Sequence, residues 1–107
     1  MGWVIETLNA SVDKEVSALP ADVRASLVRI SELIEEFGLD RVQGPHLKHL
    51  QGRLWEMRLK GRDGIFRALY VAATGQRVVI VRVFAKKTQK TPDEEIKLAL
   101  RRAKEVE

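Results

Sequence analysis

The chain of 107 residues is long enough for one domain with a modest core and too short for two. It contains no cysteine, which excludes disulfide bonds, thiolate zinc sites and cysteine nucleophiles. No apolar run approaches the roughly 20 residues of a membrane span, and the N-terminus lacks the basic and apolar regions of a secretory signal. We therefore expect a single domain over residues 1–107, located in the cytoplasm and not in a membrane.

The charge is unevenly distributed along the chain. Residues 1–40 contain eight acidic and three basic residues, a net charge of −5, whereas residues 41–107 contain seven acidic and sixteen basic residues, a net charge of +9. The basic part favours a polyanionic partner, with nucleic acid before acidic protein. A solvated basic surface without a partner is the alternative on charge alone.

A short strand and two helices are predicted in the first 38 residues. Residues 3–8 have the composition of a strand, and Asn9 or Ser11 can cap the short helix that follows. The second helix has Pro20 in its first turn and Gly38 directly after its end. Its apolar residues recur at spacings of four and three: Val23, Leu27, Ile30, Ile34 and Phe37. These patterns predict a helical hairpin.

Residues 39–51 are predicted to form an irregular connector, because Gly44-Pro45 interrupts them. Three strands should follow, at residues 53–60, 65–73 and 77–84, joined by tight turns that contain glycine. The first strand alternates between an apolar face, Trp55, Met57 and Leu59, and a polar face, Glu56, Arg58 and Lys60.

The last two strands are apolar on both faces, which is typical of central strands covered on both sides, although they contain Arg67 and Arg82. After a basic loop, a capping box at residues 91–94 predicts the final helix, with Pro92 as its first residue. Its apolar stripe comprises Ile96, Ala99, Leu100 and Ala103. The order of one strand, two helices, three strands and one helix predicts an α+β fold.

Four segments resemble, in the same order, the phage-derived branch of the RelE/HigB toxin superfamily: HLKHL (46–50), LWEMR (54–58), FRALY (66–70) and FAKKTQKTP (84–92). The resemblance implies a RelE-like α+β fold, in which two N-terminal helices pack on one side of a twisted antiparallel sheet (β-α-α-β-β-β) that is followed by a C-terminal helix.

The resemblance also implies the toxin of a type II toxin–antitoxin system. Such a toxin is a ribosome-dependent endoribonuclease (mRNA interferase) that binds mRNA on the other face of the sheet. It transfers a phosphoryl group to the neighbouring ribose 2′-hydroxyl without a metal or cofactor. The implied partners are mRNA, the ribosome and a cognate antitoxin, which we expect to contain a helix-turn-helix domain.

This reaction needs a proton acceptor for the 2′-hydroxyl, a proton donor for the leaving 5′-oxygen, and cations for the phosphate. By resemblance, Arg67 corresponds to the arginine that grips the scissile phosphate. Arg58, Lys86 and Lys87 correspond to the basic residues around it. The alternative for Arg67 is a structural salt bridge to a buried acid such as Glu56. Glu56 itself could accept a proton or orient Arg58.

The proton-transfer groups are less evident, because other branches use a tyrosine or histidine near the C-terminus and this chain has neither after Tyr70. His46 and His49 are the possible substitutes, but two histidines without a neighbouring acid or cysteine make no metal site. Tyr70 could stack on a base, although core packing is the stronger expectation for Tyr70 and Trp55. The expected RNA contacts are Lys48, His49, Arg53, Lys60, Arg82, Lys90 and Tyr70.

Two other functions stay open at this point. A toxin of the same fold could poison DNA gyrase, as the ParE branch does, although the basic set at 58, 67, 86 and 87 matches the nuclease branch better. A non-catalytic RNA- or protein-binding module is the second alternative, favoured by the missing C-terminal tyrosine or histidine.

Overall fold

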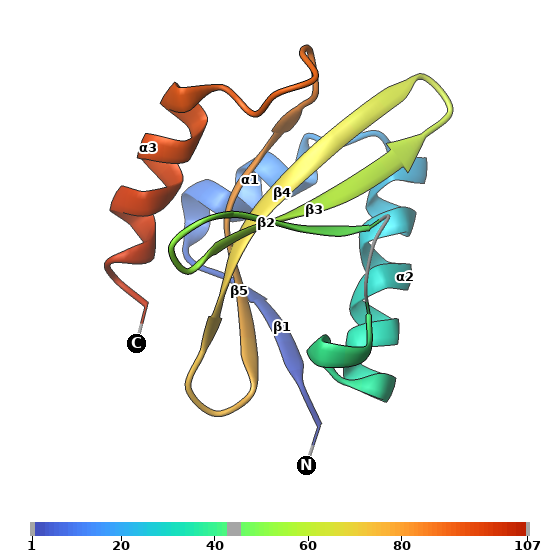
Figure 1. Ribbon diagram of the computed structural model, residues 1–107. Coiled ribbons are helices and arrows are strands. Elements are labelled where there is room, and N and C mark those ends of the chain that lie inside the picture. The colour runs from blue at the N-terminus through green and yellow to red at the C-terminus, as the bar shows by residue number, and fades with distance from the viewer. Residues whose placement is uncertain (1, 43–45, 107) are drawn as a thin grey trace.

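A computed structural model of the chain describes residues 2–42 and 46–106. In this structure a five-stranded sheet lies between helices on both of its faces (Figure 1). The elements are β1 (Val4–Thr7), α1 (Ala10–Ser17), α2 (Ala21–Phe37), the 3-10 helix η1 (Leu39–Arg41), β2 (Leu47–Gln51), β3 (Leu54–Gly61), β4 (Gly64–Ala73), β5 (Arg77–Ala85) and α3 (Asp93–Ala103). The predicted α+β class is confirmed.

The sheet has the strand order β1-β5-β4-β3-β2. Strands β2 to β5 are antiparallel neighbours, whereas β1 pairs with β5 in parallel. The expectation of a fully antiparallel sheet is therefore wrong at this edge. The reason is the crossover through α1 and α2, which brings the chain back over one face before β5 is added beside β1.

Strand β2 is a second correction, because residues 47–51 were expected in a connector. They pair with β3, with Lys48 opposite Glu56 and His49 opposite Trp55, and the register shifts between His49 and Gln51. The strand is short and carries no alternating apolar pattern, so the ladder with β3 defines it rather than its own composition. The breaker Gly44-Pro45 lies outside the described residues.

Both helices of the N-terminal hairpin begin and end close to their predicted boundaries. Asn9 caps α1, and its Oδ1 accepts a hydrogen bond from the Val12 amide at 3.1 Å. Pro20 is the N-cap of α2 rather than part of its first turn, and Gly38 follows the last residue with φ +88°. Phe37 is an exception to the predicted buried stripe, because it is 53% exposed.

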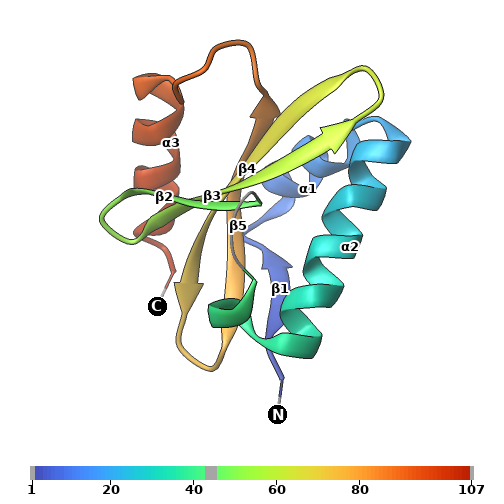
Figure 2. The same ribbon diagram turned by 45° about the vertical axis from the view of Figure 1, so that its right-hand side comes forward.

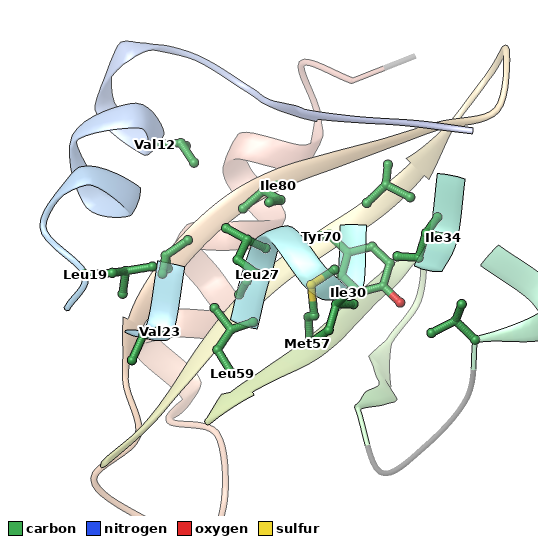
Figure 3. Close-up of a cluster of buried hydrophobic side chains, with 14 residues drawn as sticks. Val12, Leu19, Val23, Leu27, Ile30, Ile34, Met57, Leu59, Tyr70 and Ile80 are labelled. Atoms are coloured by element: carbon green, nitrogen blue, oxygen red, sulfur yellow. The ribbon is translucent and has the colours of Figure 1, made fainter. Parts of the chain in front are cut away.

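Helices α1 and α2 cover one face of the sheet, and the larger core lies between these helices and the sheet (Figure 3). Tyr70 belongs to this core, together with Met57, Ile34 and Ile80. The start of α2 also touches the β3–β4 turn. A Cβ atom at Gly61 would lie 2.5 Å from Cγ2 of Val23, so this turn needs glycine for the close approach of the helix.

Helix α3 lies on the opposite side of the sheet from α2 (Figure 2). Its buried residues Ala99 and Ala103 pack in a second cluster with strand residues Leu54, Leu69, Val71, Val79 and Val81. Strands β4 and β5 are thus covered on both faces, as predicted. The helix covers only the part of this face that these residues occupy. The adjoining part lies under the segment that joins β5 to α3 (Figure 1).

Candidate functional site

Charged residues gather on the face of the sheet that α3 covers only in part. Lys48 on β2 is paired with Glu56 on β3, and Arg58 on β3 is paired with Arg67 on β4. Side chains two residues apart on a strand share a face, so this register places the four on one side of the sheet. Lys86 follows β5 and is electrostatically coupled to all four. The structure therefore brings together four of the five predicted catalytic residues, Glu56, Arg58, Arg67 and Lys86, with Lys48 beside them.

A buried ion pair forms the floor of this site. Nε of Arg67 lies 3.3 Å from Oε1 of Glu56, and the two residues are only 4% and 7% exposed. The structural salt bridge considered for Arg67 is therefore present. Glu56 holds Arg67 in this arrangement, and the idea that it orients Arg58 stays a prediction.

The guanidinium of Arg67 also binds the loop of residues 86–92, which has no regular secondary structure. Its Nη2 donates to the carbonyl oxygens of Thr88 at 3.1 Å and Gln89 at 2.6 Å. Its Nη1 is buried and has no hydrogen-bond partner among the described residues. Arg67 thus has one nitrogen whose donors are unused, and its contact with a phosphate stays a prediction.

Thr91 makes a contact that the sequence did not indicate. Its hydroxyl donates to Oε1 of Glu56 at 2.5 Å, and the residue is buried. It forms no side-chain cap at the start of α3, where Pro92 is the N-cap rather than the first helical residue. The predicted capping box is wrong, because the threonine hydroxyl binds the carboxylate on the sheet instead of the helix amides.

Exposed cations stand around the buried pair. Arg58 and Lys48 are exposed, and Lys86 is partly exposed at the end of β5, where its amide donates to the Ile65 carbonyl at 2.8 Å. Desolvation lowers the pKa of Lys86, and the nearby positive charges of Arg58 and Arg67 lower this pKa further. Lys87 and Lys90 are exposed on the same loop.

Two predicted RNA contacts are instead engaged in the fold. Arg82 binds Glu95 through Nε at 2.6 Å and Nη2 at 3.1 Å, and its Nη1 lies 3.0 Å from Glu15. The hydrogen bond to Glu95 is the main reason that the pKa of Arg82 is raised. Arg53 donates to the carbonyl oxygens of Val106 at 3.0 Å and Ala72 at 3.4 Å. Carboxylates or backbone oxygens bind these guanidinium groups in this structure, and the contact of either residue with RNA stays a prediction.

Of the two aromatic residues expected in the core, only one is buried there. Tyr70 is 1% exposed and burial raises its pKa, so its core packing is confirmed and its predicted contact with RNA is wrong for this conformation. Trp55 was expected in the core but is 39% exposed. Its ring packs edge-on against His49, with the ring centroids 5.1 Å apart. Trp55 alternates with Glu56 along β3, which places Trp55 and His49 on the other face of the sheet.

His49 is therefore a poor proton-transfer candidate in this site, and its contact with RNA stays a prediction. Its Nε2 lies 2.7 Å from the Gly52 carbonyl oxygen. His46 is closer to the site, because its carbonyl accepts a hydrogen bond from the Arg58 amide at 2.8 Å. His46, Arg58 and Lys60 line one hollow together with α2 residues Ser26, Arg29, Ile30 and Leu33, and Lys60 is exposed.

The described residues contain no group of three or more His, Asp and Glu side chains that could hold a metal ion. Over the same residues, no helix is both long and apolar enough to cross a bilayer.

Comparisons with known proteins agree with this architecture. Residues 14–104 match the model of the family described as "Phage derived protein Gp49-like (DUF891)". The structure is similar to that of an arginine-to-alanine double mutant of the E. coli toxin RelE in the free state, with a TM-score of 0.68 and 19% identity over 95% of this chain and 98% of that one. It is also similar to a chain of the archaeal RelE–RelB complex from Pyrococcus horikoshii OT3, with a TM-score of 0.55 and 15% identity over 81% and 98%. No curated protein matches the sequence. The predicted RelE-like fold is confirmed.

Proposed function

Because the chain belongs to the Gp49-like family of phage-derived proteins and has the RelE fold, we propose that it is the toxin of a type II toxin–antitoxin system. Its activity is that of a ribosome-dependent endoribonuclease, which places its site of action in the cytoplasm. Cleavage transfers the phosphoryl group from the 5′-oxygen of one nucleotide to the 2′-oxygen of the preceding ribose, which leaves a 2′,3′-cyclic phosphate and a free 5′-hydroxyl.

One observation supports this proposal above the others. Exposed Arg58, Lys48 and partly exposed Lys86 surround the buried Arg67–Glu56 pair on the part of the sheet that α3 leaves uncovered. A cluster of fixed cations stabilises the negative charge that develops on a phosphate during transfer. Lysine and arginine supply this charge without a metal ion, so the proposed reaction is metal-independent.

Lys86 is the proposed proton donor to the leaving 5′-oxygen. Its lowered pKa makes the ammonium group a stronger acid than an ordinary lysine. His46, beside Arg58, is the proposed acceptor of the 2′-hydroxyl proton. One oxygen of Glu56 forms the ion pair with Arg67 and accepts a hydrogen bond from Thr91, which suits Glu56 to hold Arg67 rather than to take a proton. Lys87, Lys90 and Lys60 are the proposed further contacts with the RNA backbone.

The proposed partner is a cognate antitoxin, with a helix-turn-helix domain and an adjacent reading frame. The similar archaeal protein was solved as a RelE–RelB complex, which supports a protein partner for this chain as well. Co-expression of the adjacent frame should restore growth to cells that produce the chain. Growth that is normal at high expression of the chain alone would contradict the toxin assignment.

The direct test uses purified bacterial ribosomes programmed with a defined mRNA, on which the 5′ ends are mapped after the protein is added. We expect cuts at fixed positions relative to the codon, in wild type and in the control Lys14→Met, whose lysine is exposed on α1. The double variant Arg58→Met with Lys86→Met should not cut. Cleavage of free RNA that depends on an added divalent metal would contradict the proposal.

A non-catalytic RNA-binding module of the same fold is the second candidate. It is favoured by the engagement of Arg67 with Glu56 and the loop, and by the absence of tyrosine and histidine after Tyr70. Binding to programmed ribosomes without new 5′ ends would support it. DNA damage without RNA cleavage would instead support a gyrase poison of the ParE type.

A further inference from the structure

The loop of residues 86–92 carries three lysines of the candidate site and has no regular secondary structure to fix it. We propose that Thr91 is a positioning residue. Its hydroxyl donates a hydrogen bond to Glu56, which fixes this loop on the sheet and so determines the position of the Lys86 side chain. The inference rests on the proposed function for the meaning of Lys86, but its physical part can be measured without RNA.

The hydroxyl of Thr91 forms its hydrogen bond with the sheet and not with the helix that follows. Thr91 is 5% exposed, Glu56 is 7% exposed, and their oxygens are 2.5 Å apart. A threonine directly before a helix commonly caps the helix amides, yet α3 has no side-chain cap. The start of α3 is thus joined to the middle of β3 by a buried hydrogen bond to a charged acceptor, a strong type of hydrogen bond.

The other ties of the loop converge on the same ion pair. Arg67 holds the carbonyl oxygens of Thr88 and Gln89, and Arg67 is itself bound to Glu56 through the oxygen that accepts from Thr91. At its other end the loop is continuous with β5, where the Lys86 amide pairs with the Ile65 carbonyl. Glu56 is therefore the common anchor, and Thr91 is the contact that closes the loop onto this anchor.

Loss of this contact changes where the lysines lie. Without the hydroxyl, the loop keeps only the arginine contacts, and its C-terminal end can move away from the sheet. The Lys86 amide stays paired with the Ile65 carbonyl at the end of β5, but movement of the residues that follow shifts the Lys86 side chain relative to Arg58 and Arg67, whose positive charges lower its pKa. A displacement of about 1 Å of a reacting group can reduce a rate about 100-fold, so a shift of the loop matters even when the fold persists.

The test compares Thr91→Val, which removes the hydroxyl and keeps the shape, with Thr91→Ser, which keeps the hydroxyl. Thr7→Val is the matched control, because the Thr7 hydroxyl also donates to a carboxylate, that of Asp13, but does so at the start of α1. We expect Thr91→Val to cut ribosome-bound mRNA about 10- to 100-fold more slowly. Thr91→Ser should restore the rate, and Thr7→Val should leave it unchanged.

Two measurements on the free protein separate positioning from general destabilisation and do not require cleavage. In Thr91→Val, amides 86–90 should exchange with solvent faster while the core amides keep their protection, and the pKa of Lys86, followed by NMR, should rise toward the ordinary lysine value. Unchanged loop exchange and an unchanged Lys86 pKa would overturn the inference.

If Thr91→Val does not fold, Thr91→Ala takes its place under the same criteria. If the wild type cuts no RNA while both NMR effects are present, the proposed function fails and the positioning role of Thr91 stands.

Discussion

One face of the sheet carries two buried or partly buried arginines whose surroundings differ. Arg82 lies between α1 and α3, where Glu15 and Glu95 both bind it. Arg67 has a single carboxylate, that of Glu56, and its other contacts are neutral carbonyl oxygens of the loop. The residues around Arg67 then add further positive charge. The comparison indicates that the fold neutralises its charge where helix α3 packs and keeps an excess of positive charge where the loop lies.

The largest expected effect is that of Arg67→Ala. Glu56 would remain buried without its cation, and breaking such a pair costs about 3–5 kcal/mol. The free energy of unfolding in urea should fall by this amount, and cleavage should fall by about 100-fold or more. Arg67→Lys should keep part of the activity, since lysine retains the charge but not the planar guanidinium that can donate two hydrogen bonds to one phosphate. An Arg67→Ala protein with wild-type stability and wild-type cleavage would remove Arg67 from both roles.

A paired substitution sharpens this result. Arg67→Met combined with Glu56→Leu removes both charges, and apolar replacements of a buried ion pair are often neutral or stabilising. The double variant should therefore regain most of the stability that Arg67→Ala loses, but none of the cleavage. Recovery of both properties would show that the pair has only a structural role.

The next effect is that of Lys86→Met, which should act on cleavage alone. Lys86 is partly exposed and forms no ion pair among the described residues, so the unfolding free energy should stay within about 0.5 kcal/mol of wild type. The rate on programmed ribosomes should drop about 100-fold. Lys14→Met, on the remote helix α1, is the control and should alter neither quantity. Equal rates for the two variants would contradict the role of Lys86.

Arg82→Met should lower the stability of the fold and leave cleavage unchanged, the opposite of Lys86→Met. It leaves the partly buried Glu95 without its cation, whereas Glu15 keeps Arg102 at 3.0 Å, and the loss should cost about 1–3 kcal/mol of stability. Cleavage per folded molecule should be unchanged, because these contacts lie between the helices and the sheet. Denaturant unfolding and a cleavage rate normalised to folded protein test both statements. A specific loss of cleavage would place Arg82 in the site after all.

The smallest expected effect is a change in pH dependence. Arg58→Met removes a positive charge that lowers the pKa of Lys86, so this pKa should rise. A protonated Lys86 is the active form in the proposed reaction, so cleavage should decline as the pH rises through its pKa. The decline should therefore move to higher pH in Arg58→Met, apart from any loss of rate. Rate profiles with pH and NMR titration of Lys86 provide the measurement, and a decline at the wild-type pH would contradict the coupling.

Periodicity was sufficient for most of the fold and failed where pairing or a remote partner decided the structure. The stripe of α2 follows from local spacing, and the turn at Gly75 follows from the conformational freedom of glycine. Strand β2 does not, because its ladder with β3 determines it. The parallel pairing of β1 likewise depends on the crossover through two helices and not on the four residues of the strand.

In the candidate site, too, the local pattern predicted some contacts and missed those between distant segments. The alternation of β3 correctly placed Glu56 and Arg58 on one face, and the sequence raised the Arg67–Glu56 pair as an alternative. It could not show that Arg82 meets two acids from distant helices, or that the Thr91 hydroxyl turns from its helix toward Glu56. Both outcomes depend on distances between segments that the local pattern does not contain.

The parallel edge of the sheet has a consequence for the order in which the molecule can form. Val4 pairs with Arg77 and Thr7 with Ile80, and Glu15 accepts from the amide of Val83. During synthesis, β1 therefore has no ladder partner, and Glu15 of α1 has no amide from β5, until β5 has emerged. Contacts so distant along the chain also favour slow closure of the sheet. The cationic site, which needs β5 and the loop after it, is among the last parts of the protein to be assembled.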